Sequence, residues 1–210
     1  MQPVAGMYEL FILGKLMHRP MHGYVLQSII NAALGPFRRL SWGTLYPLLR
    51  RLEEAGYIAA QRGKSIDGRG TRNYRTTAPG RNRFFELMRS PIDGDYRDVF
   101  RIKVSNFGHI KKADQQMILE DYRTFLEAIV NHSEAMAREV VNAPGLITSE
   151  RPYVLLAVDH QRHLAASEIA WLDALIEHTG GKGEHSKGTI STPDRKPRRA
   201  RTRAGSNSRR

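Results

Sequence analysis

The sequence predicts a mainly α-helical protein that contains one small β-hairpin. Three observations support this fold class. Apolar residues recur at intervals of three and four along much of the 210-residue chain, as they do in amphipathic helices. One stretch, residues 57–77, instead holds two short runs with β-branched and aromatic residues on either side of a glycine-rich segment. Serine, threonine, proline and glycine stand where these helices are expected to begin and end.

The first half of the chain opens with two predicted helices. Pro20 interrupts the first, and the second extends over residues 22–33 until Gly35 and Pro36 end it. The core face of the first helix consists of Met7, Leu10, Phe11, Leu13 and Met17.

A third helix is predicted within the segment SWGTLYPLLRRLEEAGYI, residues 41–58. The Ser41 side chain can accept a hydrogen bond from a free amide of the first turn, and Gly56 stands where a helix-ending glycine belongs. One face of this helix is apolar and consists of Leu45, Leu48, Leu49, Leu52 and Ala55. The residues off that face are Thr44, Tyr46, Arg50 and Arg51. Such a helix is suited to the major groove of DNA, although taken alone it could be an ordinary surface helix.

A predicted β-hairpin follows this helix. Residues 57–62 and 72–77 form its strands, and basic residues gather at the glycine-rich turn between them. A helix followed by such a hairpin is the winged helix-turn-helix pattern, in which the helix reads base edges and the hairpin, or wing, contacts phosphate. Thr77 can cap a further helix, with Pro79 near its start.

These segments closely resemble the PadR family of bacterial transcriptional regulators. The matching pieces are PMHGY (residues 20–24), LGPFRRLSWGTLYPLLRRLEEAGYI (34–58) and RNYRTTAPGR (72–81). The chain departs from the family at Ala78-Pro79, where acidic residues are common, and in its somewhat long wing turn. The resemblance extends over residues 5–90 and implies a winged helix-turn-helix domain.

Together, the pattern and the resemblance predict the domains and the site. We expect a DNA-binding domain at residues 1–90, a helical dimerisation and effector domain at 91–179, and a disordered basic tail at 180–210. Ser41 and Trp42 are expected to contact the DNA backbone, and Arg50 a base edge. The complete predicted DNA-binding set is Arg38, Arg39, Ser41, Trp42, Thr44, Tyr46, Arg50, Lys64, Arg69 and Arg72.

Charge supports a polyanionic partner without reference to the resemblance. Residues 38–90 hold 12 Lys and Arg against 4 Asp and Glu, whereas residues 91–180 hold 9 against 14. Residues 181–210 hold 10 against 2. The net charge of +12 is therefore concentrated on the predicted DNA-binding unit and the tail, as expected of a nucleic-acid-binding protein. The tail could add non-specific attraction to phosphate or could be solvated without a partner.

The acidic half is predicted to be helical over residues 96–109 and 114–141 and in a last helix from the Ser149 cap to residue 178. The last two helices have heptad-like apolar seams, and that of the last helix includes Ile169 and Leu172. Such seams favour either a two-fold dimer, in which these residues face the partner, or a hairpin packed within its own chain. The resemblance implies the dimer, as well as release from DNA by a small aromatic or hydrophobic effector. The aromatic residues that we expect near such an effector are Phe100, Phe107, Tyr122 and Trp171.

Several other functions lack a matching pattern. The chain has no cysteine, which fits a reducing cytoplasm and excludes thiolate chemistry. GKS at residues 63–65 has neither the spacing nor the following helix of a phosphate-binding loop. His160 and His163 are spaced to touch one metal, but paired surface histidines are more often solvent-facing. The apolar run at residues 10–17 is too short to span a membrane. We therefore expect no catalytic residues, metal, cofactor or membrane partner.

The sequence thus predicts a cytoplasmic, homodimeric protein that binds double-stranded DNA at specific sequences and regulates transcription. By resemblance it is a repressor released by a small effector. The alternative is a helical interaction module whose basic face binds nucleic acid without sequence preference. An enzyme is a third interpretation, for which no set of residues is recognisable.

Overall fold

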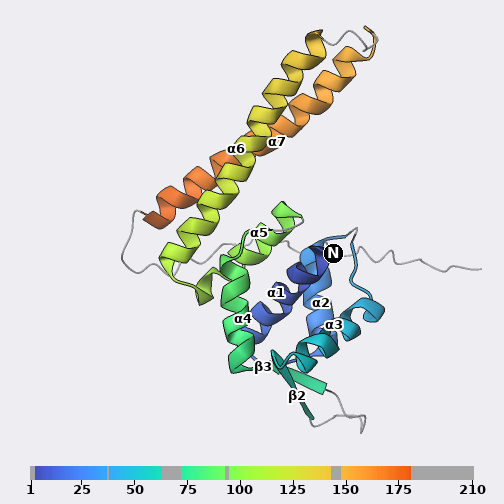
Figure 1. The fold of residues 1–210 in the computed structure, drawn as a ribbon, viewed down its shortest axis with the longest axis vertical. Helices are drawn as coiled ribbons and strands as arrows, with labels where there is room; N and C mark the ends of the chain where they lie inside the picture. The colour runs from blue at the N-terminus through green and yellow to red at the C-terminus, as the bar shows by residue number, and fades with distance from the viewer. Residues whose placement is uncertain (1–2, 37, 63–71, 93–94, 143–147, 181–210) are drawn as a thin grey trace, which may run out of the picture.

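The computed structural model confirms the predicted fold class, a mainly helical chain with one small antiparallel sheet (Figure 1). It describes residues 3–36, 38–62, 72–92, 95–142 and 148–180. The elements in chain order are α1 (Pro3–His18), β1 (Met21–His22), α2 (Gly23–Leu34), α3 (Trp42–Glu54), β2 (Ile58–Arg62), β3 (Arg72–Thr76), α4 (Ala78–Arg89), α5 (Tyr96–Val104), the 3-10 helix η1 (Phe107–His109), α6 (Lys112–Asn142) and α7 (Arg151–Gly180).

The described elements form two parts that meet at α5. Helices α1 to α4 pack with the sheet at one end of the molecule, and we refer to them as the winged-helix part (Figure 1). Helices α6 and α7 form a long hairpin that extends from the other end. Helix α5 packs against α1 and against α6, so it joins the two parts.

The sheet has one strand more than the sequence predicts. Its order is β1-β3-β2, with antiparallel neighbours. In β1, Met21 pairs with Tyr74, and Ala60 of β2 pairs with Tyr74 from the other side. Because β1 is only two residues long, it shows no alternation of apolar and polar residues, and the sequence suggested the start of a helix there instead.

Helix α3 is oriented by the apolar face that the sequence predicted. Leu45, Leu48, Leu49 and Leu52 are all buried, and α3 packs against α1, α2 and β2. Ala55 is exposed, contrary to expectation, because the helix ends at Glu54 and Ala55 already belongs to the C-cap. Burial of one face leaves the opposite face of α3 to the solvent.

Hydrogen bonds at the base of the wing connect α3 to α4. The Thr77 side chain caps α4 as predicted, accepting a hydrogen bond from the Gly80 amide at 3.1 Å. Its hydroxyl also donates to the carbonyl of Gly56 at 2.6 Å, at the turn where Gly56 adopts a φ of 73°. A Cβ at Gly80 would lie 1.9 Å from the Tyr57 carbonyl oxygen, so only glycine allows this close approach. The wing is therefore attached rigidly at its root.

Two helix boundaries in the acidic half differ from the prediction. The helix expected over residues 96–109 ends at Val104 and is followed by η1. Buried Asn106 lies between them and donates a hydrogen bond to the carbonyl of Ile102 at 2.8 Å. Ser149 does not cap α7, because the amides of Tyr153 and Val154 bond to the carbonyl of Glu150 instead.

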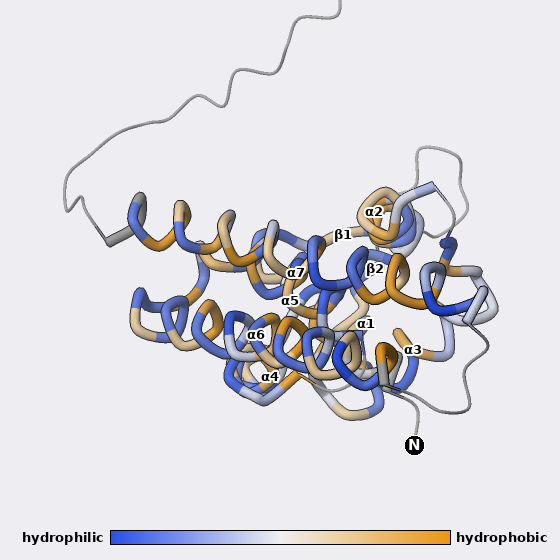
Figure 2. Tube along the Cα trace, turned by 90° about the horizontal axis from the view of Figure 1, so that it is seen from above, coloured by the Kyte–Doolittle hydropathy of each residue, from blue (hydrophilic) through white to orange (hydrophobic). Residues whose placement is uncertain are grey.

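The apolar seams of α6 and α7 face each other within the chain. Ile118 and Tyr122 of α6 are buried, as are Ala165 and Leu172 of α7, and Ile169 is half-buried in the same core. Both helices carry apolar and polar residues within their turns, as amphipathic helices do (Figure 2). Ile169 and Leu172, which we expected to face a partner, therefore pack inside the hairpin. None of the described helices is long and apolar enough to cross a membrane.

Candidate nucleic-acid interface

The solvent-facing side of α3 presents aromatic and polar groups together. Ser41 caps the helix as predicted, since its side-chain oxygen accepts a hydrogen bond from the Thr44 amide at 3.2 Å. Trp42 and Tyr46 stack with their ring centroids 5.2 Å apart, although their side chains are 41% and 53% exposed. Large aromatic side chains held in a fixed position at the surface are typical of binding sites. The start of α3 therefore forms a rigid, partly apolar surface that no other described element covers.

Arg50 lies on the same exposed face, one turn beyond Tyr46. Its Nε is 2.8 Å from Oε1 of Glu54, and both side chains are largely exposed. Exposed ion pairs of this kind contribute only about 0.3–0.5 kcal/mol in a helix. The pair orients the guanidinium group without preventing a stronger anionic or base partner from displacing Glu54.

The root of the wing brings a second arginine to this face. Arg72, the first residue of β3, has its guanidinium 3.8 Å from the Glu53 carboxylate. Glu53 also accepts a hydrogen bond from the amide of Ala60 in β2 at 3.3 Å, so it connects α3 to both strands of the wing. A hollow between α3 and the wing is lined by Tyr46, Pro47, Arg50, Glu53, Arg72 and Tyr74.

Sequence reasoning did not single out Glu53. The only available signal was its place in LRRLEE next to a helix-ending glycine, which gives no indication of a partner in the wing. Its role is evident only from the pairing of α3 with residues that follow it in the chain.

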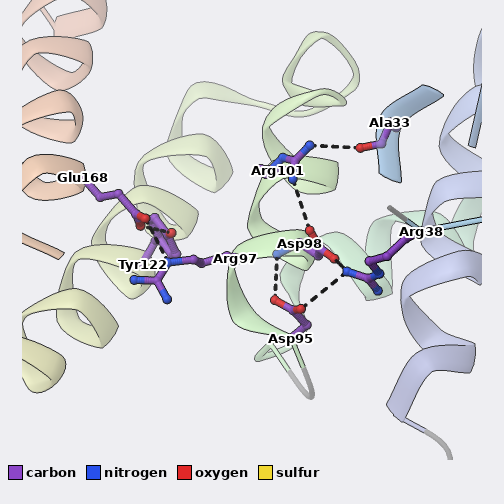
Figure 3. Close-up of polar contacts among 8 residues, drawn as sticks. All are labelled: Ala33, Arg38, Asp95, Arg97, Asp98, Arg101, Tyr122 and Glu168. Carbon is purple, nitrogen blue, oxygen red and sulfur yellow. Dashed lines mark hydrogen bonds and ion pairs between the residues drawn. The ribbon is translucent and has the colours of Figure 1, made fainter. Parts of the chain in front are cut away.

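The remaining predicted DNA-binding residues separate into three groups. Arg39 is exposed and forms no ion pair within the described part of the chain. Arg38 pairs with Asp98 of α5, and the Asp95 carboxylate lies 3.7 Å from its guanidinium group (Figure 3). Burial opposes the charged form of Arg38, but the two carboxylates outweigh it and raise its pKa. Lys64 and Arg69, like the basic tail after residue 180, lie outside the described residues.

Two of the four aromatic residues expected near an effector, Phe100 and Tyr122, lie in the core, and half-exposed Trp171 borders them. Phe100 and Tyr122 stack with centroids 3.6 Å apart, and Trp171 meets Phe100 edge-on at 6.4 Å. The Tyr122 hydroxyl donates to Glu168, and burial together with this carboxylate raises the Tyr122 pKa. Phe107 lies in η1 and makes no ring contact with this group among the described residues. Phe100 and Tyr122 are each only 3% exposed, so they fill space between α5 and α6.

An apolar pocket of about 240 Å³ lies instead where α1, α2 and α5 meet. It is at the junction of the two parts, and none of the four aromatic residues expected near an effector lines it. Its apolar lining consists of Met7, Tyr8, Phe11, Ile29, Ile30, Ala33, Leu34 and Ile102. Its polar groups are Lys15, Asp98, Arg101 and Ser105.

The winged-helix part and the exposed face of α3 define the class of protein, a winged helix-turn-helix DNA-binding protein. The profile of the transcriptional regulator PadR-like family matches residues 12–86, which extend from α1 to α4. The chain belongs to this family of transcriptional regulators, which are not enzymes. No curated protein sequence matches the chain.

The solved structures similar to this chain include one from Thermoplasma acidophilum and two from Bacillus subtilis. TA0346 from Thermoplasma acidophilum is 30% identical over 40% of this chain and 78% of its own, with a TM-score of 0.37. Bacillus subtilis PadR in complex with operator DNA is 18% identical over 81% of this chain and 96% of its own, with a TM-score of 0.38. Bacillus subtilis PadR in complex with p-coumaric acid is 17% identical over 87% and 100%, with a TM-score of 0.36.

The exposed position of Arg50 leads to a prediction about DNA recognition. If Arg50 reads a base edge, Arg50→Ala costs about 1–3 kcal/mol of operator affinity and relaxes specificity at one base pair. The measurement is fluorescence anisotropy with operator variants that differ at single positions. Arg162→Ala is the matched control, because Arg162 also pairs with an acidic residue of its own helix, Asp159 at 2.8 Å, but lies on α7. Equal weakening on operator and random DNA would reassign Arg50 to phosphate.

Proposed function

We propose that this protein is a homodimeric, sequence-specific transcriptional repressor. The observation that carries the proposal is the exposed face of α3, on which Trp42, Tyr46 and Arg50 stand beside Arg72 at the root of the wing. Aromatic, hydroxyl and guanidinium groups in one fixed array can distinguish base edges, whereas binding without sequence preference requires only positive charge. This arrangement favours specific recognition over the alternative of a non-specific nucleic-acid-binding module.

The test of this function is a comparison of two DNA duplexes of equal length at physiological salt. One contains the region upstream of the protein's own gene, and the other has the same composition in shuffled order. We expect the native region to bind roughly a thousandfold more tightly, as is usual for specific DNA-binding proteins. Equal affinities that fall steeply with salt would contradict the proposal and favour the non-specific module.

The outward face of α7 supports a dimer, at positions other than those expected from the sequence. Tyr153, Leu156, Leu164 and Trp171 are between 46% and 73% exposed. Tyr153, Leu164 and Trp171 are separated by 11 and 7 residues and so lie on one face of the helix, away from the face packed on α6. An exposed apolar stripe on a long helix is typical of an interface, and a second copy of the chain would present the same stripe.

Dimerisation is therefore expected to depend on the exposed stripe. Leu164→Asp places an unpaired charge in the proposed interface and should give monomers in sedimentation velocity, with weaker operator binding because one half-site is lost. Ala166→Asp is the control, because Ala166 is exposed on a different face of the same helix. A Leu164→Asp protein that remains dimeric would exclude this stripe as the interface.

The junction pocket supports release by a small apolar acid. Its lining is mainly apolar, and Lys15 and Arg101 can pair with a carboxylate. A structure of Bacillus subtilis PadR contains p-coumaric acid, an aromatic acid of suitable size to serve as a probe.

We predict that p-coumaric acid releases the protein from operator DNA. Lys15→Met keeps the length of the side chain but removes its charge, and should raise the concentration needed for release by roughly tenfold, with operator affinity unchanged in the absence of the acid. Anisotropy of the operator complex during titration measures both quantities. Identical release curves for the wild type and Lys15→Met would place the acid outside this pocket.

A further inference from the structure

Helix α5 binds three different elements through residues that are close together in its sequence. Arg97 pairs with Glu168 of α7, with 2.9 Å between Nε and Oε1. Asp98 pairs with Arg38, in the segment before α3. Arg101 donates to the carbonyl of Ala33, in the last turn of α2, at 2.9 Å. Figure 3 shows these contacts side by side, with the hairpin on one side of α5 and the winged-helix part on the other.

Asp98 is the centre of this arrangement. One of its carboxylate oxygens binds Arg38, and the other accepts a hydrogen bond from Arg101 at 3.2 Å. The Asp98 side chain is only 14% exposed, whereas that of Arg38 is 46% exposed. Asp95, which caps α5 by accepting from the Asp98 amide at 3.2 Å, places a second carboxylate 3.7 Å from Arg38. The Nη1 end of the Arg38 guanidinium group is thus held by α5 in this conformation.

The segment that contains Arg38 leads directly into α3. Leu40 is buried, its amide donates to Asn31 of α2 at 2.6 Å, and its carbonyl accepts from Gln27 at 3.0 Å. The next residue, Ser41, caps α3. The start of α3 is therefore attached to α2 through Leu40 and to α5 through Arg38, so a shift of α5 changes the position of α3.

The same residues of α5 line the junction pocket. Asp98 and Arg101 contribute to its wall, together with Ala33, whose carbonyl Arg101 binds. An acid that pairs with Arg101 would compete with both Asp98 and the Ala33 carbonyl, because a guanidinium group has a limited number of donors in a fixed plane. Occupation of the pocket would thereby loosen the contact between α5 and the segment before α3.

We propose that Arg38, Asp98 and Arg101 form a clamp that positions α3 for DNA binding and transmits occupation of the junction pocket to it. This inference rests on the proposed function. It makes Arg38 a positioning residue rather than a DNA contact, which replaces the role expected from the sequence. Arg39, exposed and without an ion pair within the described residues, is then the one of these adjacent arginines that contacts phosphate.

The test is a double-mutant cycle of Arg38→Met and Asp98→Asn, read out as operator affinity. The clamp predicts that each single variant binds the operator roughly tenfold more weakly than the wild type. The double variant should lose no more operator affinity than either single variant, because each single variant already removes the Arg38–Asp98 interaction. If Arg38 contacted DNA, Asp98→Asn would leave the affinity unchanged or increase it by freeing Arg38, and this result would overturn the clamp. Arg38→Lys, which keeps the charge but not the planar fork, should fall between the wild type and Arg38→Met.

Salt dependence and effector response distinguish the clamp from a loss of stability. Arg39→Met should reduce the slope of log affinity against log salt by about one, whereas Arg38→Met should leave the slope unchanged. At saturating p-coumaric acid, Asp98→Asn should also show a smaller fold-loss of operator affinity than the wild type, because its clamp is already open. A slope that falls equally for both arginine variants would overturn the assignment. Preference of the wild type for operator over shuffled DNA tests the proposed function separately.

Discussion

The burial of four leucines on one side of α3 is the constraint on which the rest of the structure depends. Each contributes roughly 1.5–3 kcal/mol when fully buried, so any rotation of α3 about its axis would expose apolar surface at a large cost. The orientation of the opposite face follows from this constraint. Trp42, Tyr46 and Arg50 are exposed because the leucines are buried, and the Ser41 cap determines where the face begins.

The same helix is restrained at both ends by contacts from distant parts of the chain. At its end, Glu53 binds the amide of Ala60 and lies near Arg72, which fixes the wing relative to α3. At its start, Arg38 connects the preceding segment to α5, which also binds the α6–α7 hairpin through Arg97. Under the proposed function, an effector would have to favour one of two positions of the DNA-reading helix. The described contacts provide a physical connection from the hairpin and the junction pocket to α3.

Local features of the fold were predictable from the sequence, and contacts between distant residues were not. The caps at Ser41 and Thr77 and the leucine face of α3 follow from residues within one or two turns. Strand β1 exists only because Met21 and His22 pair with β3, some fifty residues further along. The pair of Arg38 with Asp98 joins residues sixty positions apart. Heptad spacing at Ile169 and Leu172 identified an apolar seam, but spacing alone does not distinguish a partner helix in the same chain from one in a second copy.

The most direct test of the central claim is to locate the start of α3 on DNA. Because the chain has no cysteine, Gly43→Cys can carry a single iron–EDTA group, and a side chain there meets only the Ser41 hydroxyl oxygen at 3.7 Å. The account predicts hydroxyl-radical cleavage in the major groove at two symmetric positions about one helical turn, or a multiple of it, apart on operator DNA. The same group on Ala166→Cys of α7 should give no such pattern. Cleavage spread evenly along the duplex, or equal cleavage from both positions, would contradict the account.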